Sequence, residues 1–244
     1  MKFEIMYYLT LACPTVEDTL RKIDEYVAHG VDNFQLDMPS NDPFGETDFV
    51  KEMMKGALQQ NTDYNYYMDV LLGIRKKYPS IKLSIVVYAD VIDAIGCDRY
   101  VAFLKELGTA NNMIAGDMPE ARKAMEEMGV TCTYFITYND PEYDIERLLL
   151  LNLNKENIIT MRTKRRTDSL NRRYDTWDKR VKLVHDSGIK ASLYAVAEIF
   201  SKKDMLERKN AGLDGAIVGN SLMQLWDDEP ALWILLNEFQ SVVE

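Results

Sequence analysis

The chain has 244 residues, of which 47% are hydrophobic and 28% are charged, so it can bury a core and is neither disordered nor fibrous. It carries 29 Lys and Arg residues against 39 Asp and Glu residues, and the net charge of −10 argues against a general nucleic-acid binder. No apolar run approaches the ~20 residues that span a bilayer, and the widely spaced Cys13, Cys97 and Cys132 form no metal-binding motif. These features predict a globular, cytoplasmic protein without a membrane segment or a cofactor motif.

Short apolar segments rich in β-branched and aromatic residues alternate with helical patterns along the chain. The first helical pattern follows Thr15, which with Asp18 forms a capping pair. A later pattern is expected to place Leu148, Leu149 and Leu151 on a buried helix face. The predicted strands are residues 3–11, 33–38, 82–89, 112–115, 131–137, 157–161, 190–196 and 215–218.

Glycines mark the ends of the predicted helices, because glycine readily adopts the left-handed backbone on which many helices end. These glycines are Gly30, Gly108, Gly129, Gly188 and Gly212. Alternation of eight strands with helices predicts an α/β fold in which a parallel sheet closes into a (β/α)8 TIM barrel. We therefore expect residues 1–244 to form a single barrel domain. An open doubly wound sheet is the alternative, although no G-x-G-x-x-G motif follows the first strand.

The second predicted strand is the most informative segment for function, because such barrels place their active sites at the carboxyl ends of the strands. Side chains alternate along a strand, so Asn33, Gln35 and Asp37 are expected to point into the barrel while the apolar residues between them face the helices. Buried polar side chains are costly without partners. This row is therefore either a structural hydrogen-bond layer or the floor of an active site.

The loop after the second strand, residues 40–48, carries further acids, including Glu46, and is long enough to act as a lid. A carboxylate at the barrel mouth and a second one on a loop suit general acid–base chemistry. Burial of Asp37 would raise its pKa toward neutrality. The alternative is an all-oxygen Mg²⁺ site built from Asp37, Asp42, Glu46, Asp90 and Asp117.

Two later segments are candidates for binding an anion. The eighth strand runs into Gly219 and Asn220 and then a helix, where backbone N–H groups favour phosphate, although such a turn is also common without a ligand. The basic segment after the sixth strand is a solvated loop face, a lid whose guanidinium groups hold an anion, or an RNA contact. Its basic residues are Arg162, Lys164, Arg165, Arg166, Arg172 and Arg173.

The second strand and its loop resemble the strand-2 signature of the tryptophan synthase alpha chain family. They read Val31-Asp-Asn-Phe-Gln-Leu-Asp-Met-Pro-Ser-Asn-Asp-Pro43, and the family pattern is roughly V-D-x-x-E-L-G-x-P-x-S-D-P-x-A-D-G-P. Further similar stretches lie at residues 9–14, 87–89, 116–119 and 211–221. The resemblance implies a ribulose-phosphate-binding-barrel-like lyase of tryptophan biosynthesis. Such a lyase cleaves indole-3-glycerol phosphate by a retro-aldol reaction, needs no cofactor and meets a beta chain partner through the loop after strand 2.

The resemblance also implies two catalytic carboxylates, whose positions in this chain are Gln35 and Glu46. Gln35 cannot move a proton as a carboxylate does. Asp37 faces the same way where the family has glycine, so it either supplies the missing acid or fills space that the indole ring needs. The remaining implied positions are substrate contacts at Tyr88, Asp117, Arg162, Arg166 and Thr167 and phosphate contacts at Ala197, Gly219 and Asn220.

The main hypothesis is therefore a lyase that acts on indole-3-glycerol phosphate or a related phosphorylated small molecule, with Asp37 and Glu46 as its acid–base pair. The first alternative, favoured by Gln35, is a catalytically inactive barrel that serves as a partner subunit or a ligand-binding protein. A Mg²⁺-dependent transferase on the same scaffold is the third hypothesis. We expect a phosphorylated small molecule and a beta chain-like subunit as partners, and neither nucleic acid nor a membrane.

Overall fold

The computed structural model describes residues 3–163 and 173–243, and within them eight strands follow one another in the order β1 to β8 of a closed barrel. The (β/α)8 fold predicted from the alternation of strands and helices is thus confirmed, and the open sheet is wrong. The chain divides into two compact units, one from Tyr7 to Cys132 and one from Thr133 onward together with the residues up to Met6. That residues 1–244 form a single domain stays a prediction.

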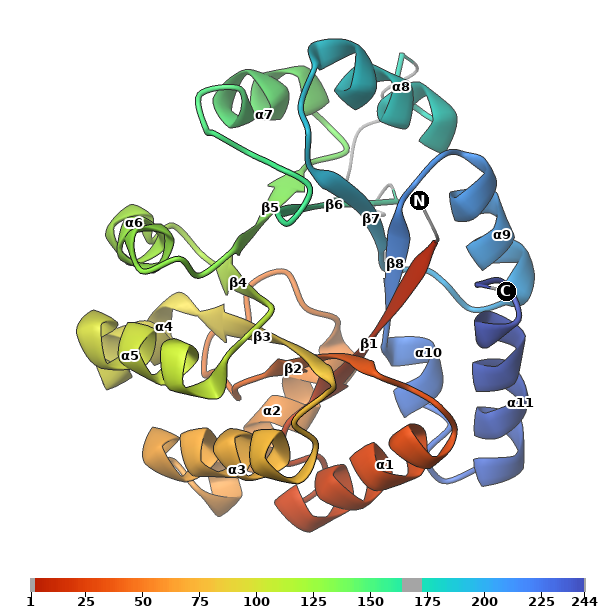
Figure 1. The fold of residues 1–244 in the computed structure, drawn as a ribbon. Helices are drawn as coiled ribbons and strands as arrows, with labels where there is room; N and C mark the ends of the chain where they lie inside the picture. The colour runs from red at the N-terminus through yellow and green to blue at the C-terminus, as the bar shows by residue number, and fades with distance from the viewer. Residues whose placement is uncertain (1–2, 164–172, 244) are drawn as a thin grey trace. The chain divides into compact units, whose positions relative to one another are not determined.

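The unit from Tyr7 to Cys132 holds most of β1 and the parallel strands β2 to β4, with helices on their outer side (Figure 1). Asp37 of β2 lies opposite Thr10 of β1 and Val86 of β3. The elements are β1 (Glu4–Thr10), α1 (Val16–Ala28), β2 (Asn33–Asp37), α2 (Asp48–Gln60), α3 (Tyr64–Lys77), β3 (Lys82–Tyr88), α4 (Ala89–Ile95), α5 (Cys97–Leu107), β4 (Asn111–Ala115) and α6 (Pro119–Glu127).

The other unit holds β5 except for its first residue, Cys132, and the strands β6 to β8 parallel to it, again with helices along their outer side (Figure 1). Its elements are β5 (Cys132–Ile136), α7 (Pro141–Leu148), β6 (Ile158–Arg162), α8 (Trp177–Ser187), β7 (Ser192–Val196), α9 (Lys202–Asn210), β8 (Gly215–Val218), α10 (Asn220–Met223) and α11 (Glu229–Gln240). Among the described residues, none of the helices combines the length and the apolar character that a membrane crossing requires.

The helix cap and the glycines at helix ends that the sequence predicts are confirmed, but one predicted buried helix face is wrong. Thr15 caps α1, since its hydroxyl accepts a hydrogen bond of 3.1 Å from the amide of Asp18. The five glycines predicted at helix ends all have positive φ angles, from 62° to 90°. However, α7 ends at Leu148, and Leu149 and Leu151 are 51% and 38% exposed, so the buried face predicted there is wrong. The chain leaves the helix in a turn at this point, and helical spacing no longer decides which side chains are buried.

Packing of α1 against the strands fixes which side of β2 faces inward. Tyr26 of α1 contacts Tyr7 of β1 and Phe34 of β2, with ring centroids 6.0 Å and 6.4 Å away. Phe34 therefore faces the helix layer. Because successive side chains of a strand point to opposite faces, Gln35 and Asp37 lie on the inner face, as predicted.

Gly215, the first residue of β8, lies where no side chain fits. A Cβ atom there would stand 2.7 Å from the carbonyl oxygen of Glu4 and would also meet the ring of Tyr194, whose hydroxyl donates a hydrogen bond of 2.9 Å to the Glu4 carboxylate. We expect Gly215→Ala to lower the free energy of unfolding by about 2 kcal/mol through overpacking. Urea denaturation measures this change.

The matched control is Gly56→Ala in the interior of α2, where no atom lies within 4 Å of the added carbon. This substitution should raise the free energy of unfolding by roughly 0.5–1 kcal/mol, since alanine favours the helix over glycine. Equal effects of the two substitutions would contradict the packing explanation for Gly215.

Candidate active site

Asp37 is the last residue of β2, and its exposed fraction is 0%. One oxygen accepts a hydrogen bond of 3.1 Å from the amide of Leu11, and the other accepts one of 3.2 Å from the hydroxyl of Thr10. The hydroxyl of Tyr8 donates to this second oxygen as well. All three donors belong to β1 or to the residue after it. The carboxylate therefore ties the end of β2 to the end of β1.

The surroundings of Asp37 change its proton affinity. Burial raises the pKa of Asp37 to about 7, and the charge of Glu46 acts in the same direction, whereas the hydrogen bonds from Tyr8, Leu11 and Thr10 oppose the rise. A carboxyl group with a pKa near neutrality can take up and release a proton under ordinary conditions. The upward shift that the sequence led us to expect is thus present.

Tyr88, the last residue of β3, forms a hydrogen bond with the carboxylate of Glu46 in the loop after β2. Its hydroxyl donates a hydrogen bond of 3.2 Å to Glu46, which is partly exposed. Burial is the main reason that the pKa of Tyr88 lies far above its ordinary value, and a hydrogen bond with the hydroxyl of Tyr8 acts in the opposite direction. Two tyrosine hydroxyls therefore lie between the carboxylates of Asp37 and Glu46.

Tyr8 also belongs to this cluster, although it was not predicted from the sequence. It lies in register with Gln35 of β2, and it is partly exposed, whereas Asp37 and Tyr88 are each 0% exposed. The alternation of side chains along β1 places Tyr8 and Thr10 on the inner face together, so the same period that pointed to Asp37 could have indicated both.

The loop between β2 and α2 is anchored to the start of α4. The carboxylate of Asp90 accepts hydrogen bonds of 2.6 Å from the hydroxyl of Ser40 and 3.0 Å from the amide of Asn41. Further along the loop, Phe44 is 71% exposed. Among residues 3–163 and 173–243, no three His, Cys, Asp or Glu side chains are grouped as a metal site would require.

The polar row next to Asp37 is not a saturated hydrogen-bond layer. Gln35 is 4% exposed and lies in register with Ser84 of β3. Within the part of the chain that the structure describes, the hydroxyl oxygen of Ser84 and the side-chain oxygen of Asn33 are buried with no hydrogen-bond partner. Buried polar atoms without partners are rare in folded proteins. Both interpretations of this row, a structural layer and the floor of an active site, therefore stay predictions.

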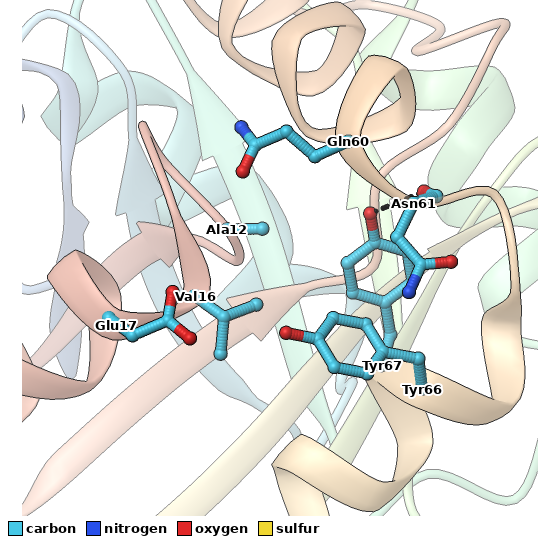
Figure 2. Close-up of a pocket in the computed structure, with 7 residues that line it drawn as sticks. All are labelled: Ala12, Val16, Glu17, Gln60, Asn61, Tyr66 and Tyr67. Atoms are coloured by element: carbon cyan, nitrogen blue, oxygen red, sulfur yellow. Dashed lines mark hydrogen bonds between the residues drawn. The ribbon is translucent and has the colours of Figure 1, made fainter.

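A separate pocket of about 210 Å³ opens beside the residues that follow β1. Figure 2 shows the Tyr66 hydroxyl pointing toward Val16 and Glu17, with Gln60 on another side of the space. Its wall includes Ala12, whose φ of 62° is left-handed and which follows the Leu11 amide that holds Asp37. None of the site residues expected from the sequence lines this pocket, so it is distinct from the carboxylate cluster.

Of the other expected substrate contacts in this unit, Asp117 is exposed after β4. It follows Gly116, where a Cβ atom would stand 2.9 Å from the side chain of Ala89, the residue after Tyr88. The exit of β4 therefore packs against the start of α4, and Asp117 begins the loop beyond that contact.

The expected phosphate-binding residues lie after β7 and β8. Ala197 and Glu198 both have a left-handed backbone, with φ angles of 68° and 52°, and the Arg208 guanidinium donates a hydrogen bond of 3.2 Å to the Glu198 carbonyl. A left-handed backbone costs a residue with a side chain roughly 1–2 kcal/mol, so glycine would adopt the backbone at Ala197 with less strain than alanine does. Gly219 is buried, and Asn220 begins the four-residue helix α10.

Arg162 ends β6 and is partly buried, and its carbonyl accepts a hydrogen bond of 2.5 Å from Arg180 of α8. The guanidinium of Arg180 also lies 4.1 Å from the ring centroid of Trp177. Arg180 therefore links the exit of β6 to the first turns of α8. Arg166 and Thr167, the other substrate contacts expected here, lie outside the described residues.

Comparison with known proteins identifies the family. The profile described as tryptophan synthase alpha chain matches residues 2–232. The chain belongs to the tryptophan synthase alpha chain family. The tryptophan synthase alpha chain of Zymomonas mobilis is 30% identical over 120 residues, which cover 49% of this chain and 43% of that one. The alpha chain of Erwinia tasmaniensis is 29% identical over 117 residues, or 48% and 43% of the two chains. In these matches the chain spans less than half the length of its curated relatives.

Solved tryptophan synthase structures share the fold over nearly the whole chain. The alpha subunit from Legionella pneumophila superposes with a TM-score of 0.79 at 17% identity, covering 99% of this chain and 92% of that one. A mutant alpha subunit from Pyrococcus furiosus gives a TM-score of 0.78 at 16% identity, covering 99% and 100%. At such identities the likeness shows the alpha-chain fold alone. The resemblance seen in the sequence to the tryptophan synthase alpha chain family is confirmed.

Proposed function

We propose that this alpha-chain family member is a carbon–carbon lyase that cleaves indole-3-glycerol phosphate or a related phosphorylated small molecule by a retro-aldol reaction. The observation that supports this proposal is the pair of carboxylates, Asp37 and Glu46, separated by tyrosine hydroxyls at the ends of β1 to β3. Such a cleavage needs one group that accepts a proton from the substrate hydroxyl and another that gives or holds a proton as the bond breaks. The pKa of Asp37, about 7, suits the first role.

Gln35 is proposed to bind the substrate rather than to move its proton. Its amide can donate and accept hydrogen bonds but has no proton to exchange near neutral pH. It lies in register with Tyr8 and Ser84 on the inner face, next to the unpaired hydroxyl oxygen of Ser84. In this proposal Asp37, two residues further along β2, takes over the acid–base role.

The roles of the remaining site residues belong to the same proposal. Tyr88, Asp117 and Arg162 are proposed substrate contacts, together with Arg166 and Thr167 outside the described residues. The proposed phosphate contacts are Ala197, Gly219 and Asn220. The protein is proposed to work in the cytoplasm, in keeping with three cysteines that are all free, and to bind its substrate without a cofactor or a metal ion.

Release of indole from indole-3-glycerol phosphate by the purified chain tests the function directly. We expect turnover, and we expect Gln35→Glu to keep or increase it, because that change restores the carboxylate of the family pattern next to Asp37. The absence of indole release by both proteins, together with no cleavage of other glycerol phosphates, would reject the lyase proposal.

A second candidate function is that of a partner subunit without turnover. Phe44, in the loop that the family resemblance assigns to a beta chain-like partner, is 71% exposed, and exposed aromatic side chains are enriched where proteins meet. Sedimentation of the chain with a tryptophan synthase beta chain tests this candidate. A complex that Phe44→Ser weakens, in a chain that releases no indole, would favour it over the lyase.

A further inference from the structure

The carboxylate of Asp37 is enclosed by the groups that donate hydrogen bonds to it. Its exposed fraction is 0%, as is that of Thr10, and its oxygens already accept hydrogen bonds from Leu11, Thr10 and Tyr8. A carboxylate enclosed in this way can exchange a proton only through one of the groups that touch it. Two of those groups, the amide of Leu11 and the hydroxyl of Thr10, are buried with it.

Tyr8 differs from these neighbours because it is partly exposed. Its hydroxyl donates to one oxygen of Asp37, lies 3.2 Å from the hydroxyl oxygen of Thr10 and contacts the hydroxyl of Tyr88. It also lies in register with Gln35, the residue that the proposed function assigns to substrate binding. Of the three residues that donate hydrogen bonds to Asp37, Tyr8 is thus the one that is partly exposed.

We propose that Tyr8 is the catalytic residue that meets the substrate, and that Asp37 acts behind it as the acceptor of the proton. This inference rests on the lyase function proposed above. When the substrate hydroxyl gives its proton to the oxygen of Tyr8, the proton of Tyr8 passes to the carboxylate of Asp37. One O–H bond breaks and one forms at Tyr8, so the tyrosine stays neutral and the charge moves from Asp37 to the substrate oxygen.

The energetics favour this route over an ionised tyrosine. Burial, followed by the charges of Asp37 and Glu46, raises the pKa of Tyr8 well above its ordinary value, so a free tyrosinate is costly there. Passing the proton on to Asp37 in the same step avoids that charge. The hydroxyl of Tyr88, which is 0% exposed, forms a hydrogen bond with the hydroxyl of Tyr8. In this scheme Tyr88 therefore positions Tyr8, in addition to the substrate contact proposed for it above.

Tyr8→Phe and Thr10→Val form a matched pair for the test, because each removes one hydroxyl donor from the same oxygen of Asp37. If protons pass through Tyr8, Tyr8→Phe should lower kcat by roughly 100-fold with little change in KM and should remove the rise of activity near neutral pH. Thr10→Val should lower kcat by less than roughly ten-fold and shift that rise to higher pH, since a hydrogen bond that favours the carboxylate is lost. Similar small effects of both variants would overturn the proposal.

A second measurement does not depend on turnover. The ζ-carbon resonance of Tyr8 in labelled protein, assigned by its absence in Tyr8→Phe, should titrate with the pKa of Asp37, about 7, and should stop doing so in Asp37→Asn. A Tyr8 signal unaffected by Asp37→Asn would overturn the pairing. If this titration is seen in a chain that releases no indole, the lyase function fails while the pairing stands. If indole is released equally with and without the Tyr8 hydroxyl, the role of Tyr8 fails while the function stands.

Discussion

Replacing Asp37 with asparagine should lower kcat for cleavage of the phosphorylated substrate by about 10²–10⁴-fold. Asparagine has nearly the shape of aspartate, and its oxygen can still accept the hydrogen bond of 3.1 Å from the amide of Leu11. The substitution therefore removes the proton acceptor without opening a cavity. Because Asp37 is proposed to act as a base, kcat/KM of the wild type should rise as the pH increases through about 7, and this rise should vanish in the variant.

Restoring a carboxylate elsewhere provides the control. In the double variant Gln35→Glu/Asp37→Asn, the acid stands at the position that the family pattern gives it, so part of the lost activity should return. Initial rates of indole release across a range of pH, for the wild type, Asp37→Asn, Gln35→Glu and the double variant, check both expectations. Wild-type activity in Asp37→Asn, with an unchanged dependence on pH, would remove Asp37 from the mechanism.

The fold was predictable because its signals are local. Short apolar segments, the Thr15 cap and glycines at helix ends each depend on a few neighbouring residues, and all recur in the structure. The error at Leu149 and Leu151 has the same origin. A run of leucines continues the helical pattern past residue 148, but the turn that ends α7 depends on how the chain leaves the helix, which apolar spacing does not encode.

The candidate site was predictable only in part, because it depends on the register between strands. The alternation of side chains along β2 correctly predicts that Asp37 faces inward. It does not show that Asp37 lies opposite Thr10 or that its carboxylate accepts a hydrogen bond from the hydroxyl of Tyr8. Nor could it show that Tyr88 reaches across to Glu46, 42 residues away along the chain. Alternation along a strand predicts which face of the sheet a side chain lies on. Its contacts with residues of neighbouring strands depend on the register between the strands, which only the folded chain defines.

The stability of the chain should depend on pH through Asp37. In the folded chain the pKa of this group is about 7, and in an unfolded chain it returns to about 3.8. The protonated carboxyl stabilises the folded state fully below pH 3.8, where both states bind the proton. This stabilisation falls between pH 3.8 and 7, because the unfolded chain has then released a proton that the folded protein still holds. This contribution disappears as the pH rises through 7. With about 1.4 kcal/mol for each pKa unit, the wild type should lose about 3 kcal/mol more stability than Asp37→Asn between roughly pH 5 and pH 9.

Urea denaturation of both proteins at the two pH values measures the difference, in which contributions from all other groups cancel. Asp42→Asn, which makes the same chemical change at an exposed position in the following loop, is the matched control and should follow the wild type. A wild type and Asp37→Asn that lose stability in parallel would mean that Asp37 keeps its charge at low pH. In that case the buried carboxylate would stabilise the ends of β1 and β2 without exchanging a proton. The proposal that a residue of β2 acts in acid–base catalysis would then be rejected.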